Sequence, residues 1–280
     1  MLRRENLMGE QVDKVQIAID RLKAFEPHDG YYLAFSGGKD SCCIKELANM
    51  AGVKFDAHYS VTTVDPPELV RFIRKHHPDV IFERPELPMR KLIVKKLMPP
   101  TRIVRYCCQV LKEGGGKGRV VMTGVRWAES PRRKVQHGVA RVEQTIMNDD
   151  NAESRRMVEQ CYRTQRTMIN PIVDWSNSEV WEFIRERNLS YCSLYDEGFK
   201  RLGCVGCPMG DTRGMKKDFA RWPQYKALYI KAFDEMLKVR KEKGKDDMWT
   251  DGQEVFDWWL GLKGAKPDKN QIRIEEDDID

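Results

Sequence analysis

The chain has 280 residues, of which 33% are charged and 41% hydrophobic, with a formal net charge of +6 at pH 7. This length suits one large domain or two modest ones, and the basic excess is compatible with nucleotide or nucleic-acid partners without demonstrating them. No apolar run approaches the ~18 residues of a membrane span, and the N-terminus lacks a signal-peptide core. We therefore expect a cytoplasmic protein without a membrane partner.

Apolar residues recur at helical spacing in some segments and form short continuous runs in others, in alternation along the first half of the chain. The pattern predicts, in order, helix 12–25, strand 31–35, helix 43–51, strand 53–60, helix 68–76, strand 80–82 and strand 119–123. Alternating strands and helices predict an α/β fold in which helices flank a parallel β-sheet. Ligands bind such sheets at the carboxyl ends of the strands.

The second half of the chain is less regular. Residues 130–166 are polar and Arg-rich, which predicts a mobile or ligand-ordered excursion. Ser176 and Glu179 form a capping box for a helix, and a long helix is expected from Pro223. Residues 275–280 are almost all acidic, which predicts a disordered end.

A glycine-containing loop follows strand 31–35 and precedes a helix. It consists of Ser36, Gly37, Gly38, Lys39, Asp40 and Ser41. The glycines let main-chain N–H groups approach an anion, and the helix N-terminus adds unpaired N–H groups and a positive dipole end. Lys39 adds a mobile charge, and Asp40 indicates a magnesium ion that accompanies the phosphate. The sequence predicts a phosphate-binding loop, with a glycine turn and a serine cap as the alternative.

Eight cysteines in a cytosolic chain indicate metal binding or redox catalysis rather than disulfides. Cys107 and Cys108 are adjacent, and Cys204 and Cys207 form a Cys-x-x-Cys pair. The two pairs offer the four thiolates that zinc or an iron–sulfur cluster takes. The side chains of adjacent cysteines diverge, so it is unusual for both to bind one zinc ion. The pair Cys107 and Cys108 therefore favours a larger cluster. A structural zinc ion and a redox dithiol at Cys204 and Cys207 are the alternatives.

The loop resembles the PP-loop of the ATP pyrophosphatases, and more narrowly that of the phosphoadenosine phosphosulfate reductase family. The resemblance covers residues 30–210 and includes the segments 63–68, 105–112, 124–132 and 199–208. It implies an adenine nucleotide alpha hydrolase-like fold with a C-terminal helical region. It also implies nucleotide contacts from the loop, Thr63, Asp65 and Gly124, and a 4Fe–4S cluster on Cys107, Cys108, Cys204 and Cys207. Arg126 and Arg132, with Arg133, would suit bidentate phosphate contacts; a solvated basic loop is the alternative.

We therefore expect four parts: an N-terminal helix (1–29), a PP-loop nucleotide-binding α/β domain (30–215), a helical region (216–265) and a disordered acidic tail (266–280). The resemblance implies Lys39, Asp40, Arg126 and Arg132 as catalytic residues. Reductases of this family use a cysteine on a C-terminal segment, and no cysteine follows Cys207 here. Lys39 and Asp40 are also the Mg–ATP features of the pyrophosphatases.

We accordingly expect cleavage of Mg–ATP to AMP and pyrophosphate, adenylation of an acceptor and sulfur transfer to it. By resemblance the nearest systems are DNA phosphorothioation proteins and tRNA thiolases. They imply DNA or tRNA and a sulfur donor such as a cysteine desulfurase as partners, and a homo-oligomer is compatible with the sequence. The alternatives are an adenylyl-sulfate or phosphoadenylyl-sulfate reductase that uses an external thiol, and a non-catalytic nucleotide- or nucleic-acid-binding subunit.

Overall fold

The computed structural model describes residues 2–5, 11–245 and 248–262. The chain forms two compact units, one from Met1–Pro85 and Val110–Gly203 and the other from Glu86–Gln109 and Cys204–Asp280. These units differ from the predicted parts, because residues 86–109 pack with the C-terminal helices rather than with the sheet that precedes them. The predicted disordered tail, 266–280, lies outside the described residues.

A seven-stranded sheet in the order β5-β4-β3-β6-β9-β7-β8 forms the centre of the first unit. Its strands are β3 (Tyr31–Ala34), β4 (Phe55–Ser60), β5 (Ile81–Glu83), β6 (Val120–Met122), β7 (Ala140–Val142), β8 (Thr145–Met147) and β9 (Thr167–Ile169). The first five strands in the sheet order run parallel, whereas β7 pairs antiparallel with both β9 and β8. The predicted parallel α/β core is thus confirmed, with an antiparallel edge added. A separate hairpin pairs β1 (Arg3–Glu5) with β2 (Gln11–Asp13).

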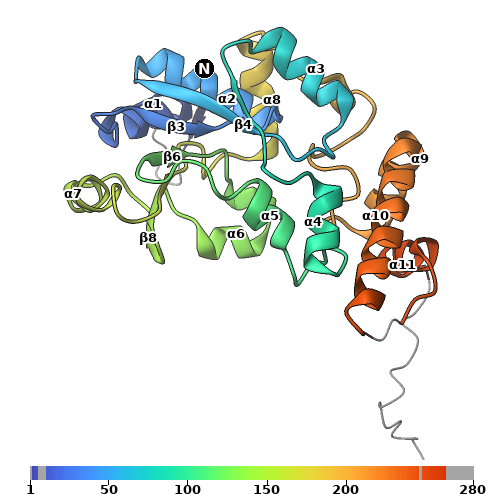
Figure 1. The fold of residues 1–280 in the computed structure, drawn as a ribbon. Coiled ribbons are helices and arrows are strands. Elements are labelled where there is room, and N and C mark those ends of the chain that lie inside the picture. The colour runs from blue at the N-terminus through green and yellow to red at the C-terminus, as the bar shows by residue number, and fades with distance from the viewer. Residues whose placement is uncertain (1, 6–10, 246–247, 263–280) are drawn as a thin grey trace, which may run out of the picture. The chain divides into compact units, whose positions relative to one another are not determined.

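The helices of the first unit follow the predicted order. They are α1 (Lys14–Ala24), α2 (Lys39–Ala51), α3 (Pro67–His76), α6 (Pro131–Gln136), α7 (Ala152–Cys161) and α8 (Asn177–Glu186), with short 3-10 turns η1 (Trp127–Glu129) and η2 (Ser193–Tyr195). Helices α1, α2 and α8 lie together on one side of the sheet (Figure 1). The Tyr31 hydroxyl donates to the Leu22 carbonyl oxygen at 2.7 Å, which ties β3 to α1. The predicted capping box of Ser176 and Glu179 starts α8.

The segment 130–166, whose composition predicted a mobile or ligand-ordered excursion, has regular secondary structure. It contains α6, β7, β8 and α7. Val139 and Ala140 are fully buried, and Ala140 lies opposite Ile169 of β9 in the sheet. The buried Asn170 amide also donates to the Gly138 carbonyl oxygen at 2.8 Å. A few buried apolar residues and the amide of Asn170, which directly follows β9, order this segment although its composition is polar.

The second unit is helical and has an aromatic core. Its helices are α4 (Met89–Lys96), most of α5 (Tyr106–Leu111), α9 (Thr212–Arg221), α10 (Pro223–Glu242) and α11 (Gly252–Trp259). The long helix expected from Pro223 is therefore confirmed. The ring centres of Trp259 and Tyr229 lie 4.8 Å apart. The indole N–H of Trp259 donates to the Pro100 carbonyl oxygen at 2.6 Å. This bond ties residues that precede α5 to the C-terminal helices. Across the described ranges, no helix has both the length and the apolar character that crossing a bilayer requires.

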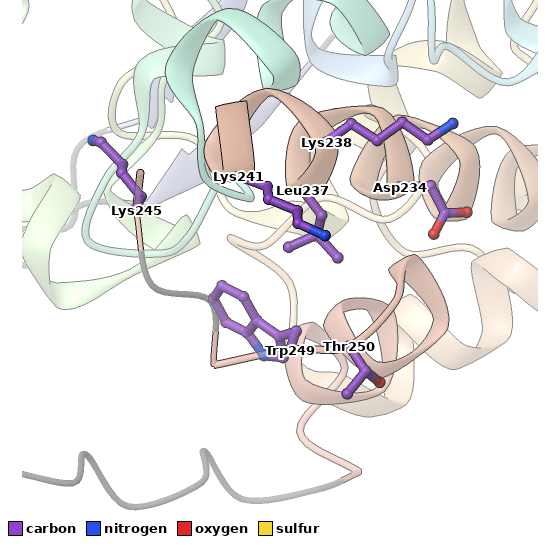
Figure 2. Close-up of a pocket in the computed structure, with 7 residues that line it drawn as sticks. All are labelled: Asp234, Leu237, Lys238, Lys241, Lys245, Trp249 and Thr250. Carbon is purple, nitrogen blue, oxygen red and sulfur yellow. The ribbon is translucent and has the colours of Figure 1, made fainter. Parts of the chain in front are cut away.

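The second unit contains a cavity of about 580 Å³ beside α10 (Figure 2). Its lining consists of Asp234, Leu237, Lys238, Lys241, Lys245, Trp249 and Thr250. The Asp234 carboxylate accepts the Gly252 N–H at 2.6 Å, so it holds the start of α11. Figure 2 shows the side chains of Lys238 and Lys245 extending in opposite directions. The lining lysines therefore do not converge on one point.

Candidate functional site

The loop between β3 and α2 has the geometry that its glycines predict. Gly37 has a φ of +70°, and a Cβ there would lie 2.7 Å from the Ile73 side chain, so the position has neither the backbone conformation nor the space for another residue. Gly38, rather than a serine, is the N-cap of α2. The strand–loop–helix arrangement places the N-terminus of α2 at the carboxyl end of β3.

Hydroxyl groups hold the loop in shape. Ser36 Oγ accepts the Gly38 N–H at 3.3 Å and donates to Ser41 Oγ at 3.2 Å. Ser41 Oγ in turn donates to the Gly38 carbonyl oxygen at 2.8 Å. The two serines therefore form a hydrogen-bonded brace across the turn.

Asp40 lies between two buried cations. Its Oδ1 accepts from Arg126 Nε at 2.7 Å, and its Oδ2 accepts from Lys39 Nζ at 3.0 Å. Lys39 and Arg126 are only 4% and 2% exposed, and Arg126 also donates to the Trp175 carbonyl oxygen at 3.1 Å. Buried charges require such partners because desolvation is costly. Three residues that the sequence predicted as catalytic thus form one ion-pair cluster with an excess of positive charge.

Gly124 lets the chain that leaves β6 pass the start of α2. A Cβ at Gly124 would lie 3.0 Å from Asp40 Cβ and 3.2 Å from the Asp40 carbonyl carbon. One residue before it, the Thr123 hydroxyl is hydrogen-bonded to the Asn170 side chain. The loop 36–41 and the segment from Gly124 onward therefore meet at one edge of the sheet, as parallel-strand topology predicts.

The predicted arginines do not form a single patch. Arg126 points inward to Asp40, and its backbone N–H donates to Glu129 Oε2 at 3.1 Å. Arg133 pairs with the same carboxylate at 3.0 Å, and burial lowers the pKa of Arg133. Arg132 is exposed and donates to the Gln136 side chain at 3.1 Å. A phosphate contact from Arg132 remains a prediction, whereas Glu129, which the sequence analysis did not select, organises this turn.

The segment after β4 is shaped by Asp65. Its carboxylate accepts from the Thr62 N–H and from the Thr62 hydroxyl, both at 2.7 Å. Thr63 is exposed and has a φ of +66°, a conformation that β-branched residues rarely adopt. Asp65 therefore builds a tight turn that presents Thr63 at its tip. Nucleotide contacts from these two residues remain predictions.

Tyr195 is a site residue that the sequence analysis missed. Its hydroxyl accepts the Lys39 N–H at 2.9 Å, across 156 positions of sequence. The Lys39 ammonium lies 5.9 Å from the centre of the Tyr195 ring. No spacing in the sequence connects η2 to the loop, so only the fold reveals this contact.

The four cysteines of the predicted metal site all belong to the second unit. All eight cysteines of the chain lie in the described ranges, and none of them forms a disulfide. A hydrogen bond with Cys108, burial, and the nearby Cys204 and Cys207 thiols raise the pKa of Cys107, so these three thiols lie within electrostatic reach of Cys107. Their thiol chemistry fits zinc or an iron–sulfur cluster. Within the described residues, no group of three or more His, Cys, Asp or Glu side chains is arranged to hold a metal ion.

Three curated relatives illustrate what the chain is similar to. An adenosine 5'-phosphosulfate reductase of Bacillus cereus is 22% identical over 232 residues, which cover 78% of this chain and 90% of that protein. An uncharacterized protein of Methanocaldococcus jannaschii is 29% identical over 224 residues, which cover 76% of this chain and 48% of that protein. A second protein of that organism is matched over 45% of its length. The chain thus spans about half the length of these two archaeal relatives.

Among solved structures, phosphoadenylyl-sulfate reductase from Candida auris has a TM-score of 0.48 and 15% identity, covering 70% of this chain and 90% of that chain. The U34-tRNA thiolase NcsA from Methanococcus maripaludis, determined with its 4Fe–4S cluster, has a TM-score of 0.43 and 11% identity, covering 92% and 94% of the two chains. Residues 30–209 match the family described as the phosphoadenosine phosphosulfate reductase domain. This match contains the whole β3–loop–α2 arrangement and spans well over half of the sequence, so the chain belongs to the phosphoadenosine phosphosulfate reductase domain family.

Proposed function

We propose that this chain is a PP-loop ATP pyrophosphatase that cleaves Mg–ATP to AMP and pyrophosphate and adenylates an acceptor for sulfur transfer. The observation that carries the proposal is the cluster of Asp40 with Lys39 and Arg126 at the start of α2. An unpaired carboxylate at this position would repel phosphate. Two buried cations offset its charge, so the cluster attracts phosphate and still contains a carboxylate for the magnesium ion of the substrate.

The residues of the cluster have separate tasks in this reaction. Lys39 turns from Asp40 to the β and γ phosphates, which releases Asp40 Oδ2. Arg126 keeps hold of Oδ1 and fixes the carboxylate, because its guanidinium is also anchored on the Trp175 carbonyl oxygen. An acceptor oxygen attacks the α phosphorus and the bond from that phosphorus to the bridging oxygen of the β phosphate breaks. Lys39 and the positive end of α2 stabilise the charge on the departing pyrophosphate.

The adenylated acceptor is then attacked by a sulfur nucleophile, which forms a bond to the acceptor and releases AMP. We infer that Cys107, Cys108, Cys204 and Cys207 hold a 4Fe–4S cluster, because all four belong to one unit and Cys107 lies within electrostatic reach of the other three thiols. When bound, such a cluster would carry or deliver the sulfur. DNA or tRNA is the proposed acceptor, and a protein such as a cysteine desulfurase is the proposed sulfur donor.

An anaerobic pyrophosphate assay with ATP and candidate acceptors tests this function. AMP and pyrophosphate in equal amounts, with a rate that depends on added DNA or tRNA, would support it. ADP and phosphate would mean cleavage between the β and γ phosphates and would overturn it. Tight ATP binding without any cleavage would instead indicate a non-catalytic binding subunit.

A sulfonucleotide reductase that uses an external thiol is the second candidate. It is favoured by the similarity to an adenosine 5'-phosphosulfate reductase that is matched over 90% of its length. In this case the loop would hold a phosphate or sulfate group of a preformed adenylyl sulfate. Sulfite released from adenylyl sulfate in the presence of a thiol, with no ATP consumed, would identify this activity.

A further inference from the structure

The first N–H group of α2 is already occupied by a phenol. Lys39 is the first residue of α2, and its N–H donates to the Tyr195 hydroxyl at 2.9 Å. The N–H groups at this end of a helix are the ones that hold a phosphate in a loop of this kind. A phosphate could therefore reach the Lys39 N–H only by displacing the Tyr195 hydroxyl.

Displacement is unfavourable because the Tyr195 ring is braced. The ring packs edge-on against Trp181, with the two ring centres 5.1 Å apart. Trp181 packs in the same way against Tyr191, with ring centres 5.2 Å apart. The neighbouring Cys192 and Leu194 are both fully buried, which anchors η2 itself. Movement of the phenol would break these contacts together with the hydrogen bond to Lys39.

The Tyr195 hydroxyl still has a proton to donate. A phenol can accept one hydrogen bond and donate another at the same time, and the Lys39 N–H uses only its accepting side. Within the described residues, no acceptor for the Tyr195 proton is found. Burial raises the pKa of Tyr195, so the hydroxyl keeps this proton at physiological pH. The oxygen also lies only 3.4 Å from the Cβ position of Gly38, directly beside the loop.

We propose that the Tyr195 hydroxyl is a substrate-binding donor of the loop, which passes the hydrogen bond from the Lys39 N–H on to a phosphate oxygen of the bound nucleotide. This inference rests on the proposed function only in that the loop binds a nucleotide phosphate. It adds to the motif residues a donor from η2, which is distant in sequence. The ring is fixed by packing, so the donor is positioned before the nucleotide arrives and little ordering is needed on binding.

The test compares Tyr195→Phe with Tyr191→Phe in the full chain. Tyr191 belongs to the same aromatic group, but its hydroxyl donates to the exposed Asp196 rather than to a group of the loop. Affinities for ATP, adenylyl sulfate and adenosine are measured by calorimetry, and the melting temperature is recorded for each variant. A hydrogen bond to a charged group typically changes affinity by about tenfold or more. Tyr195→Phe should weaken the affinity for ATP by that factor and leave the affinity for adenosine unchanged. Tyr191→Phe should change both affinities by less than about twofold.

Each other outcome has a distinct meaning. Equal or tighter ATP binding by Tyr195→Phe would show that the hydroxyl only competes with phosphate, and it would overturn the proposal. Equal weakening of ATP and adenosine would indicate a purely structural role and would overturn it as well. Wild-type protein that binds neither ATP nor adenylyl sulfate would refute it too. Binding of adenylyl sulfate but not of ATP would reject the ATP function. The role of Tyr195 would then be decided by comparing the affinities of wild type and Tyr195→Phe for adenylyl sulfate.

A second variant covers the case in which Tyr195→Phe does not fold. Trp181→Leu retains the hydroxyl and removes the edge-on contact that positions it. Trp181→Leu should weaken the affinity for ATP by less than tenfold and leave the affinity for adenosine unchanged. Unchanged ATP affinity in Trp181→Leu would contradict the fixed position that the proposal requires.

Discussion

The ion-pair cluster at the start of α2 makes Asp40→Asn the most informative substitution. The Asp40 side chain is 20% exposed, while its two cationic partners are almost completely buried. Loss of the carboxylate leaves two buried cations without their anion. Breaking a buried pair typically costs about 3–5 kcal/mol, and the partial exposure of Asp40 places the expected loss of unfolding free energy at about 3 kcal/mol. This corresponds to a melting temperature lower by roughly 6–12 °C.

Asp79→Asn is the matched control. Asp79 pairs with Lys45 at 2.6 Å, but its side chain is 59% exposed, so the expected loss is about 0–1 kcal/mol. Thermal unfolding followed by circular dichroism compares the two variants. Pyrophosphate should stabilise Asp40→Asn more than wild type, because its charge replaces that of the carboxylate. A melting temperature of Asp40→Asn no lower than that of Asp79→Asn would refute the stabilising role of the cluster.

The same variant tests the chemistry. Asp40→Asn should retain much of the ATP affinity, because the positive charge of the cluster increases when the carboxylate is removed. Pyrophosphate release should fall by on the order of tenfold to a thousandfold, the scale of losing one electrostatic stabiliser. Undiminished turnover, measured at a temperature where the variant is folded, would remove Asp40 from the mechanism.

Three further predictions concern the loop, the stability of the first unit and the thiols. Gly37→Ala should abolish ATP binding in a calorimetric titration. Gly52→Ala should retain ATP binding, because Gly52 has the same φ of 70° but open space around the added Cβ. Equal effects of the two substitutions would exclude crowding by the Cβ as the cause. Burial lowers the pKa of His77 to about 4, so the folded state binds fewer protons than the unfolded state below about pH 6.5, and stability should fall as the pH drops towards 4. His77→Gln should reduce the difference in melting temperature between pH 7 and pH 5, and an unchanged difference would contradict this assignment. Cys204→Ser should lose iron from anaerobically purified protein while Cys161→Ser retains it, whereas stoichiometric zinc without iron in the wild type would replace the cluster with a zinc site.

Much of the fold could be predicted because its signals are local. Gly37 and Gly38 directly after a strand indicated the anion-binding turn, and the structure has the expected left-handed conformation at Gly37. Ser176 and Glu179, three residues apart, were sufficient to predict the start of α8. By contrast, the polar composition of residues 130–166 concealed two strands. These strands depend on a few buried residues and on an existing sheet edge that local composition does not report.

The site shows the same division between local and long-range information. The sequence by itself determined the loop and its charged residues, because backbone conformation and helix start depend on neighbouring side chains. Only the tertiary structure decided that Arg126 pairs with Asp40, 86 positions away, rather than pointing outward. It also decided that Tyr195 occupies the Lys39 N–H across 156 positions, and that residues 86–109 pack with the C-terminal helices. The physical reason is that these partners are selected by packing and desolvation in the folded chain, which no spacing along the sequence encodes.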